Sequence, residues 1–383
     1  MGNRSFQGFV PRTVEGDETH LGALGAVPMS TLRVTAEILT VHEHPGADAL
    51  ELAQVGLYRA VVAKGAYRTG DAAVYIPEQS VLPAGLIEEL GLTGRLAGGN
   101  RDRVKAIRLR GELSQGIVCR PKALADVDLV RAAAEGTDFA QLLGITKWVP
   151  PVPPTMSGEV ESAAELLPWV DIENIQRYPE IFAPGEPVVV TEKLHGTACL
   201  LTYSAELDRV YVSSKGFGAK SLALKEDPRN LYWRAVRSHG VAEVAADLAA
   251  RLGARRVGIF GEVYGAGVQD LSYGADGRRD TLGYAVFDVS AEIDGRVRWL
   301  SPAELLTGRL PLVPHLFTGP YDSEHVLEIA TGRETVSGRE LHLREGVVIR
   351  PVAERHSPVT GTRAIAKAVS PSYLTRKNGT EYE

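Results

Sequence analysis

Short apolar or alternating runs, separated by Gly, Pro and acidic residues, recur over most of this chain and constrain its fold more than any other feature. The first group of runs comprises residues 32–44, 49–55, 57–65 and 72–78. Such spacing, with turn residues between the runs, is typical of the strands of a small β-barrel or sandwich. The sequence therefore predicts a β-rich start to the folded chain.

A Pro-rich stretch at residues 148–154 divides the chain. Such stretches are stiff and extended, so we predict a linker over residues 148–164 between a first domain at 31–147 and a second domain at 165–383. Residues 1–30 are Gly-rich and polar with little periodicity, and we predict a loose leader there.

Basic residues gather near the end of the first domain, with Asp102 as the one acid among them. On a strand, alternate side chains share a face, so these cations can follow a phosphate backbone, or they can protect an exposed edge strand. The candidates for contact with nucleic acid are Arg101, Arg103, Lys105, Arg108 and Arg110.

Composition indicates a globular protein of the cytoplasm. The chain has 383 residues, 44% of them hydrophobic, without an apolar run long enough to span a membrane and without a secretory signal. Cys119 and Cys199 are far apart and are predicted to be free thiols. The net charge of −6 argues weakly against a nucleic-acid partner, because proteins that bind nucleic acids are often basic overall. It does not exclude such a partner, because local basic patches decide contact with phosphates. We expect a monomer that does not bind membranes.

Strand-like runs also dominate the second domain, and one helix is predicted at residues 241–253, where Gly253 ends it. A further helix is expected to begin at Pro302, with Ser301 as its N-cap. The predicted fold class is therefore α+β. The predicted strands lie at residues 186–192, 198–204, 208–214, 256–264, 282–289, 295–299, 345–351 and 364–370.

A Lys followed three residues later by Gly appears at the end of one predicted strand, as Lys193 and Gly196. A Lys amine with a lowered pKa can attack the α-phosphate of a nucleotide, and Gly allows the backbone to approach a phosphate closely. The pattern alone is weak, because Lys215 and Gly218 form a second copy. The spacing by itself does not choose between the two lysines.

Six motifs decide between them by their order. Together they resemble the covalent nucleotidyltransferase superfamily of ligases and capping enzymes, and TEKLHGT is similar to the RNA ligase form of the first motif. The resemblance implies an adenylyltransferase domain, ATP-grasp-like, of antiparallel sheets with flanking helices. The motifs are TEKLHGT (191–197), SSKG (213–216), FGEVYG (260–265), YAVFDV (284–289), EGVVIRP (345–351) and AIAKAVS (364–370).

The same resemblance implies roles for individual residues. Lys193 would carry AMP, Glu345 would bind Mg²⁺ or Mn²⁺ directly or through water, and Arg350 would hold phosphate later in the cycle. The implied ATP-binding residues are Glu192 at the adenine, Gly196, Lys215 at a phosphate, Glu262 at the ribose or a metal, Tyr284 stacked on the adenine and Lys367 at the α-phosphate.

Some positions keep a structural alternative. Tyr284 is assigned to the adenine, with a core position as its alternative because it alternates with Val286 along a strand, whereas Phe287 is predicted to be core and Asp288 a structural acceptor. His195 is implied to be a positioning residue.

The last motif departs from the family pattern. Ile365 stands two residues before Lys367, where related RNA ligases often have a cation. That phosphate contact is therefore missing, or Arg363 supplies it.

The segment 44–55, HPGADALELAQV, is similar to the opening of OB folds of the tRNA-binding type, which implies an OB-like barrel for the first domain. Few residues follow Lys367, so we expect no further domain there. The architecture resembles bacterial ATP-dependent RNA ligases with an N-terminal OB module. These join 3′-OH and 5′-phosphate ends through lysyl-AMP and an AMP-capped intermediate, on nicked duplexes with RNA at the 3′-OH side. A capping-type guanylyltransferase and a non-catalytic RNA-binding protein are the alternatives.

Overall fold

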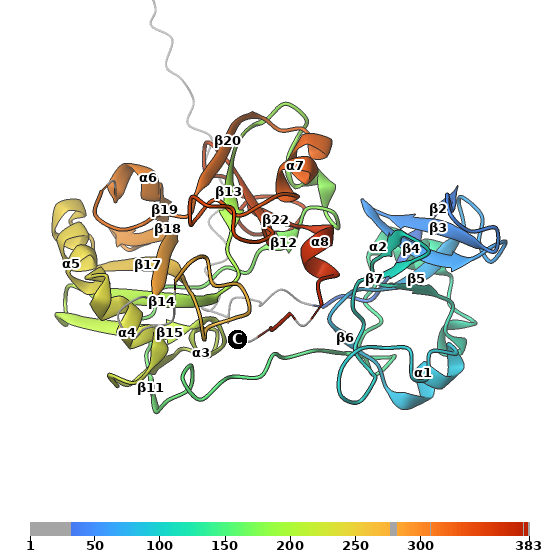
Figure 1. Ribbon diagram of the computed structural model, residues 1–383, viewed down its shortest axis with the longest axis horizontal. Helices are drawn as coiled ribbons and strands as arrows, with labels where there is room; N and C mark the ends of the chain where they lie inside the picture. Colours follow the sequence, from blue (N-terminus) through green and yellow to red (C-terminus); the bar gives the residue numbers. More distant parts are fainter. Residues whose placement is uncertain (1–31, 276–281, 307, 378, 382–383) are drawn as a thin grey trace, which may run out of the picture.

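The computed structural model describes residues 32–275, 282–306, 308–377 and 379–381. The leader predicted over residues 1–30 lies outside the described residues. Two domains are visible side by side, the first in blue to teal and the second in green to red (Figure 1).

The first domain is a small β-structure, as its alternating runs predict. Its main sheets have the orders β1-β5-β9 and β2-β3-β4, and Leu39, almost fully buried, separates β1 from β2 so that one run serves both sheets. Asp128 caps α2 with its side chain, and Gly136 ends it in the left-handed conformation. The elements are β1 (Thr35–Ile38), β2 (Thr40–Glu43), β3 (Leu50–Val55), β4 (Tyr58–Ala63), β5 (Ala72–Ile76), β6 (Ser80–Val81), α1 (Ala84–Glu89), β7 (Ile107–Leu109), β8 (Glu112–Ser114), β9 (Ile117–Cys119), the 3-10 helix η1 (Lys122–Leu124), α2 (Leu129–Glu135) and β10 (Thr146–Lys147).

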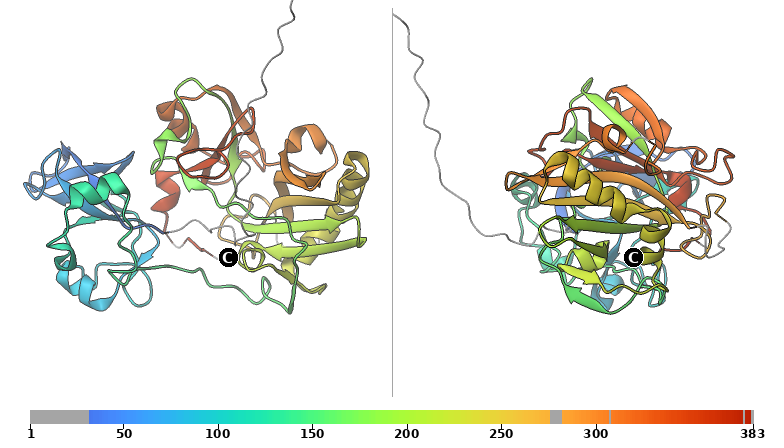
Figure 2. Two further views of the ribbon diagram at one scale, coloured as in Figure 1. Left: turned by 180° about the vertical axis from the view of Figure 1, so that it is seen from behind. Right: turned by 90° about the vertical axis from the view of Figure 1, so that its left-hand side faces the viewer.

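A seven-stranded antiparallel sheet with the order β11-β16-β15-β14-β17-β18-β19 forms one half of the second domain. The helices α4 and α5 cover one of its faces (Figures 1 and 2), and Val244 and Leu248 of α5 are buried in the core there. Its elements are β11 (Val160–Ser162), β14 (Thr197–Ser204), β15 (Arg209–Ser214), α3 (Lys215–Gly218), β16 (Leu222–Leu224), α4 (Leu231–Ser238), α5 (Val241–Leu252), β17 (Arg256–Tyr264), β18 (Gly283–Ile293), β19 (Arg296–Leu300) and α6 (Pro302–Leu305).

A five-stranded sheet with the order β12-β22-β21-β13-β20 forms the other half. Its pairs are antiparallel except β12 with β22, and Val190 of β13 and Ile349 of β21 are fully buried beneath α7. Its elements are β12 (Glu173–Asn174), the 3-10 helix η2 (Pro179–Ile181), β13 (Pro187–Lys193), β20 (His315–Pro320), α7 (Ser323–Ala330), β21 (Gly346–Pro351), β22 (Ala366–Val369) and α8 (Pro371–Leu374).

The linker prediction was wrong at its C-terminal end. Met156 is fully buried in the core of the second domain, and β11 pairs with β16 at the sheet edge. The second domain therefore begins before residue 165, because an apolar side chain and a short edge strand extend its core into the predicted linker.

The predicted helices are present, but Ser301 makes no side-chain cap to α6. The helix α4 was missed, although Asn230 caps it by accepting from the amides of Tyr232 and Trp233. No helix among the described residues is long and apolar enough to cross a membrane.

Candidate active site

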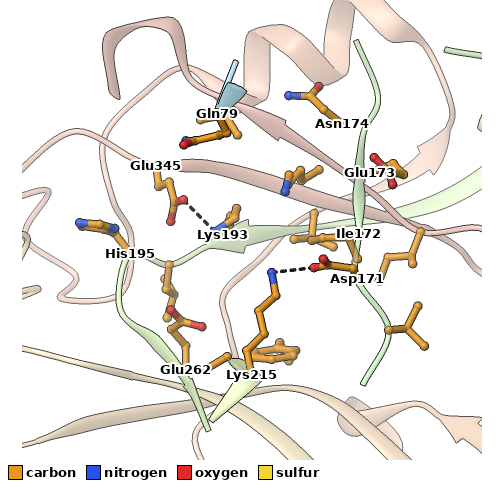
Figure 3. Close-up of a pocket in the computed structure, with 18 of the residues that line it drawn as sticks. Gln79, Asp171, Ile172, Glu173, Asn174, Lys193, His195, Lys215, Glu262 and Glu345 are labelled. Carbon is orange, nitrogen blue, oxygen red and sulfur yellow. Dashed lines mark hydrogen bonds and ion pairs between the residues drawn. The ribbon is translucent and has the colours of Figure 1, made fainter. Parts of the chain in front are cut away.

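A cavity of about 580 Å³ lies between the two sheets of the second domain and one side of the first domain. Lys193 is the last residue of β13 in the five-stranded sheet, and Thr197 begins β14 in the seven-stranded sheet. The three residues between them connect the sheets. The predicted nucleophile therefore stands where two sheets diverge and leave space between them (Figure 3).

Lys193 forms an ion pair with Glu345, with 2.7 Å between Nζ and Oε1. Burial lowers the pKa of Lys193, but Glu345 and Glu262 outweigh this effect, so the pKa lies above its ordinary value. The expectation of a lowered pKa was wrong for this state, because a lysine reaches a free amine only when its carboxylate neighbours are neutralised or engaged elsewhere.

Glu262 faces the same cavity from β17 of the other sheet. Its Oε1 accepts a hydrogen bond from the amide of Gly196 at 2.9 Å. Burial raises the pKa of Glu262 to about 8, although the charge of Lys193 opposes this shift. Glu262 thus bridges the two sheets through the loop that follows the predicted nucleophile.

Two further lysines line the cavity. Lys215, at the start of α3, pairs with Asp171 at 2.8 Å, as Figure 3 shows. Burial, reinforced by the charges of Lys215 and Lys193, lowers the pKa of Lys367 to about 8. Asp171 was missed by sequence reasoning, because it follows an irregular segment and belongs to none of the motifs.

Glu192 points to the other face of β13 and is almost fully buried. Its Oε2 accepts hydrogen bonds from the amide of Thr335 at 2.9 Å and from its hydroxyl at 2.6 Å, and Arg344 lies 3.7 Å away. Burial raises the pKa of Glu192 despite these bonds. Its Oε1 has no hydrogen-bond partner within the described part of the chain, which leaves one acceptor for a ligand.

The two aromatic assignments in β18 were reversed. Tyr284 is 1% exposed, belongs to the core beneath α4 and α5, and its ring lies against Gly261. Phe287 instead lines the cavity, where its ring meets Trp169 edge-on at 5.9 Å. Alternation along the strand explains this difference, because Tyr284 and Val286 share the helix-covered face.

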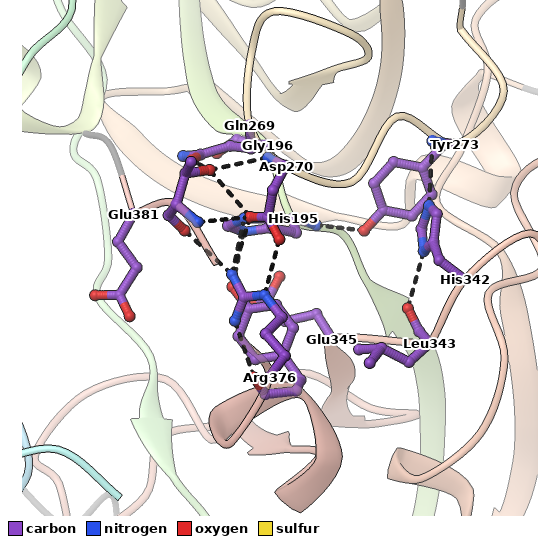
Figure 4. A network of polar contacts seen from close by, with 12 residues as sticks. His195, Gly196, Gln269, Asp270, Tyr273, His342, Leu343, Glu345, Arg376 and Glu381 are labelled. Carbon is purple, nitrogen blue, oxygen red and sulfur yellow. Dashed lines mark hydrogen bonds and ion pairs between the residues drawn. The ribbon is translucent and has the colours of Figure 1, made fainter. Parts of the chain in front are cut away.

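His195 is held by a buried cluster beside the predicted nucleophile (Figure 4). Its Nε2 lies 2.8 Å from Oδ1 of Asp270, and its Nδ1 lies 2.7 Å from the hydroxyl of Tyr373. Although burial opposes the shift, hydrogen bonds from His195 and Arg376 hold the pKa of Asp270 well below its usual range. These contacts agree with a positioning role, and they come from segments that no sequence motif covers.

Residues 186–369 match the family model for RNA ligase, and this range includes most strands of both sheets and the four residues Lys193, Glu262, Glu345 and Lys367 of the cavity. Residues 186–369 form an RNA ligase domain. This match confirms the predicted class of enzyme. A second family model, for an OB-fold domain, matches residues 32–121 and confirms the predicted fold of the first domain.

Solved structures of an RNA ligase from Naegleria gruberi have the same fold. A mutant with AMP and Mn has a TM-score of 0.72 and 24% identity, covering 90% of this chain and 98% of that chain. Another mutant, with ATP and Mn, has a TM-score of 0.71 and 24% identity over the same shares of each chain. The ligase with PPi has a TM-score of 0.70 and 24% identity, again covering 90% and 98%. No curated protein sequence matches this chain.

The basic residues near the last motif of the RNA ligase domain bind carboxylates of the protein. Arg363 pairs with Asp288 at 2.5 Å and with Glu354 at 2.5 Å, and its guanidinium lies 4.1 Å from the ring centroid of Trp299. Arg350 donates to the carbonyl of Phe287 at 2.7 Å and lies 3.5 Å from Asp288. Asp288 is therefore the structural acceptor that its position predicts. Arg363 is engaged on the wall of the cavity rather than free to replace a cation at position 365.

The basic stretch of the OB-fold domain is not one continuous strand, contrary to the first interpretation. Arg103 is 6% exposed and pairs with Glu381, and Lys105 binds the same carboxylate at 2.8 Å. Only residues 107–109 of the stretch form a strand, β7. The other candidates, Arg101, Arg108 and Arg110, are exposed, and Arg101 and Arg110 have positive φ angles in turns.

The described residues fit a divalent cation that is held mainly by phosphates. They contain no group of three or more His, Cys, Asp or Glu side chains that could hold a metal ion alone. Glu345 is 7% exposed, and its Oε2 has no hydrogen-bond partner among the described residues. One buried carboxylate oxygen beside the cavity suits Mg²⁺ or Mn²⁺, because Mg²⁺ in particular keeps several waters and uses substrate phosphates as ligands.

Proposed function

We propose that the protein is an ATP-dependent RNA ligase that joins 3′-OH and 5′-phosphate ends, with Lys193 as the carrier of AMP. The observation that carries the proposal is the meeting of Lys193, Glu345, Glu262 and Lys367 at one cavity inside the RNA ligase domain. The Naegleria gruberi structures with ATP and Mn and with AMP and Mn support the choice of nucleotide and cation.

In the first step Nζ of Lys193 attacks the α-phosphorus of ATP, a nitrogen–phosphorus bond forms, and the bond to pyrophosphate breaks. A divalent cation at Glu345 would neutralise charge on the phosphates. The ammonium proton must leave first, and the pKa of Lys193 falls when Glu345 turns from the ion pair to another partner. Lys215 and Lys367 supply positive charge where the phosphates carry negative charge.

The adenine has an aromatic wall near this centre. Phe287 and Trp169 line the cavity, and aromatic rings stack on bases with useful affinity. We assign the stacking contact to Phe287 in place of Tyr284. Glu192 offers its free oxygen to an adenine donor group, and Gly196 lets the loop beside the nucleotide lie close to the backbone of β17.

In the second step AMP moves from Lys193 to the 5′-phosphate of the nucleic acid, and a phosphoanhydride forms as the nitrogen–phosphorus bond breaks. In the third step the 3′-OH attacks that 5′-phosphorus, the phosphodiester forms, and AMP leaves. We propose a nicked duplex with RNA on the 3′-OH side as the substrate, held in part by the exposed cations Arg101, Arg108 and Arg110. Arg350 binds a phosphate of the substrate after its guanidinium has moved away from Asp288.

Transfer of label from ATP to the protein tests this proposal. The protein is incubated with α-labelled ATP or GTP and Mg²⁺ or Mn²⁺ and then denatured, and the label on the chain is counted. We expect label from ATP, its loss in Lys193→Ala, and its retention in Lys220→Ala, which removes an exposed lysine outside the cavity.

The alternatives give different results. Label from GTP instead of ATP indicates a capping-type guanylyltransferase. No label from either nucleotide, with RNA still bound, indicates a non-catalytic RNA-binding protein and overturns the proposal.

A further inference from the structure

Arg103 is held in place by Gln79 of the OB-fold domain and by Trp148, the residue that directly follows this domain. Its guanidinium carbon lies 3.3 Å from the ring centroid of Trp148, and its Nη2 donates to Oε1 of Gln79 at 2.6 Å. Neither contact depends on the second domain. Lys105 lies beside it with 34% of its side chain exposed, so a fixed cation and a reachable cation stand together.

The anion on this pair of cations comes from the far end of the chain. Glu381 binds Arg103 through Oε2 and Lys105 through Oε1, the latter at 2.8 Å. Among the described residues, the hydrogen bonds and ion pairs of its side chain all go to these two cations. In Figure 4 the Glu381 side chain points away from the His195 cluster, although its neighbour Thr380 binds Asp270.

A phosphodiester presents the acceptors that Glu381 presents, and more. The two carboxylate oxygens satisfy one Arg nitrogen and the Lys ammonium, while Nε of Arg103 is buried without a partner among the described residues. A phosphodiester has two anionic oxygens, as a carboxylate has, and its ester oxygens are additional, weaker acceptors for that donor. A phosphodiester can therefore make both ion pairs that the carboxylate makes and also offer an acceptor to Nε of Arg103.

The place of the site in the molecule indicates which phosphate it takes. Glu381 and Trp148 line the same cavity as Lys193 and Glu345. A nucleic-acid strand that reaches Lys193 along this side of the cavity would pass Glu381 and the two cations that it binds. Lys105 is partly exposed, so an arriving phosphate meets Lys105 first and Arg103 after Glu381 has left.

We propose that Arg103 and Lys105 form a phosphodiester subsite for the nucleic-acid substrate, and that Glu381 occupies this subsite in the free protein and is displaced on binding. The inference rests on the proposed function, since it concerns the substrate of the same cavity. It makes Glu381 an internal competitor of the substrate.

The test is the affinity for a nicked duplex that has an RNA 3′-OH strand, measured in low salt without ATP. Glu381→Gln keeps the size of the side chain and removes its charge, so we expect binding of the duplex to be about threefold to tenfold tighter. The slope of log affinity against log salt concentration should become steeper by about one, because one more phosphate is neutralised. Glu135→Gln, an exposed acid of the OB-fold domain, changes the net charge equally and is the control. Lys105→Gln is expected to weaken binding and to cancel most of the gain in the double variant.

Binding by Glu381→Gln that is no tighter than by Glu135→Gln overturns the inference. If Glu381→Gln melts below the assay temperature, Glu381→Asp, whose carboxylate is drawn back by one methylene, must bind more tightly for the inference to stand. Labelling of Lys193 from ATP is measured on the same preparations. Absence of label in the unmutated protein defeats the proposed function, whereas normal labelling without a gain in affinity defeats only the displacement by Glu381.

Discussion

At the scale of single residues, the environment of Lys193 decides its chemistry more than its motif does. The motif order selects Lys193 over Lys215, but the pairing with Glu345 determines that Lys193 is charged in the nucleotide-free chain. The lowered pKa belongs to Lys367, which has positive neighbours and a buried ammonium. Neighbours far apart in sequence therefore set the charge of each lysine.

The exchange of roles between Tyr284 and Phe287 gives a prediction at this scale. Phe287→Leu is expected to weaken ATP binding about tenfold, because a stacking ring is lost, with little change in melting temperature. Tyr284→Leu is expected to lower stability by about 1–3 kcal/mol, because it alters a packed core, with ATP affinity unchanged. Nucleotide titration and thermal unfolding of both variants check this. Weaker ATP binding by Tyr284→Leu alone would restore the original assignment.

At the scale of elements, the loop between β13 and β14 is the feature that positions the site. It leaves one sheet at Lys193 and enters the other at Thr197. The amide of Gly196 donates to Glu262, and its carbonyl accepts from Gln269 at 3.0 Å. The loop lies so close to β17 that only Gly fits at position 196.

A methyl group at this position should disturb the site. The Cβ of Gly196→Ala would lie 2.1 Å from the carbonyl oxygen of Val263, so the loop must move. We expect Lys193 labelling to fall by about tenfold to a hundredfold, because a shift of roughly 1 Å misplaces the nucleophile. Gly99→Ala, where a Cβ has open space, is the control for the rate measurement. Equal labelling by the two variants would show that the close approach is not needed.

At the scale of the whole molecule, the two domains meet through a few specific contacts. Arg177 of the second domain donates to Thr35 of the first at 2.8 Å and pairs with Glu37. The amide of Leu57 donates to the carbonyl of Gln176 at 2.7 Å. These contacts fix the side of the OB-fold domain that borders the cavity.

Removal of the Arg177 side-chain charge tests this interface. Arg177→Met is expected to lower the first calorimetric unfolding transition by at least about 3 °C and to separate the domains into two transitions. Nick sealing should weaken more than Lys193 labelling, since only sealing needs the duplex. Arg209→Met is the control, because Arg209 pairs with Glu161 on the surface of one domain, where ion pairs contribute little. A single unchanged transition in both variants would contradict this view of the interface.

The sequence by itself determined most of the long strands, the α+β class, the order of the motifs and the identity of Lys193 as the predicted nucleophile, but not β11, β12, β16 or β20. Periodicity and motif spacing depend on residues close together in the chain, so they can be recognised in the sequence alone. Periodicity also divided Tyr284 and Phe287 between two faces of β18. It could not say which face borders the cavity, because that depends on where α4 and α5 pack.

Only the tertiary structure decided which charges meet. Lys215 with Asp171, Arg363 with Asp288, and Arg103 with Glu381 are pairs whose members are far apart in the chain. Ion pairs between such distant residues leave no pattern in the local sequence, because each charged residue is also typical of a solvent-exposed surface. The sequence offered several cations as candidates for contact with phosphate. Only the tertiary structure shows which of them are exposed and which already form an ion pair with a carboxylate of the protein.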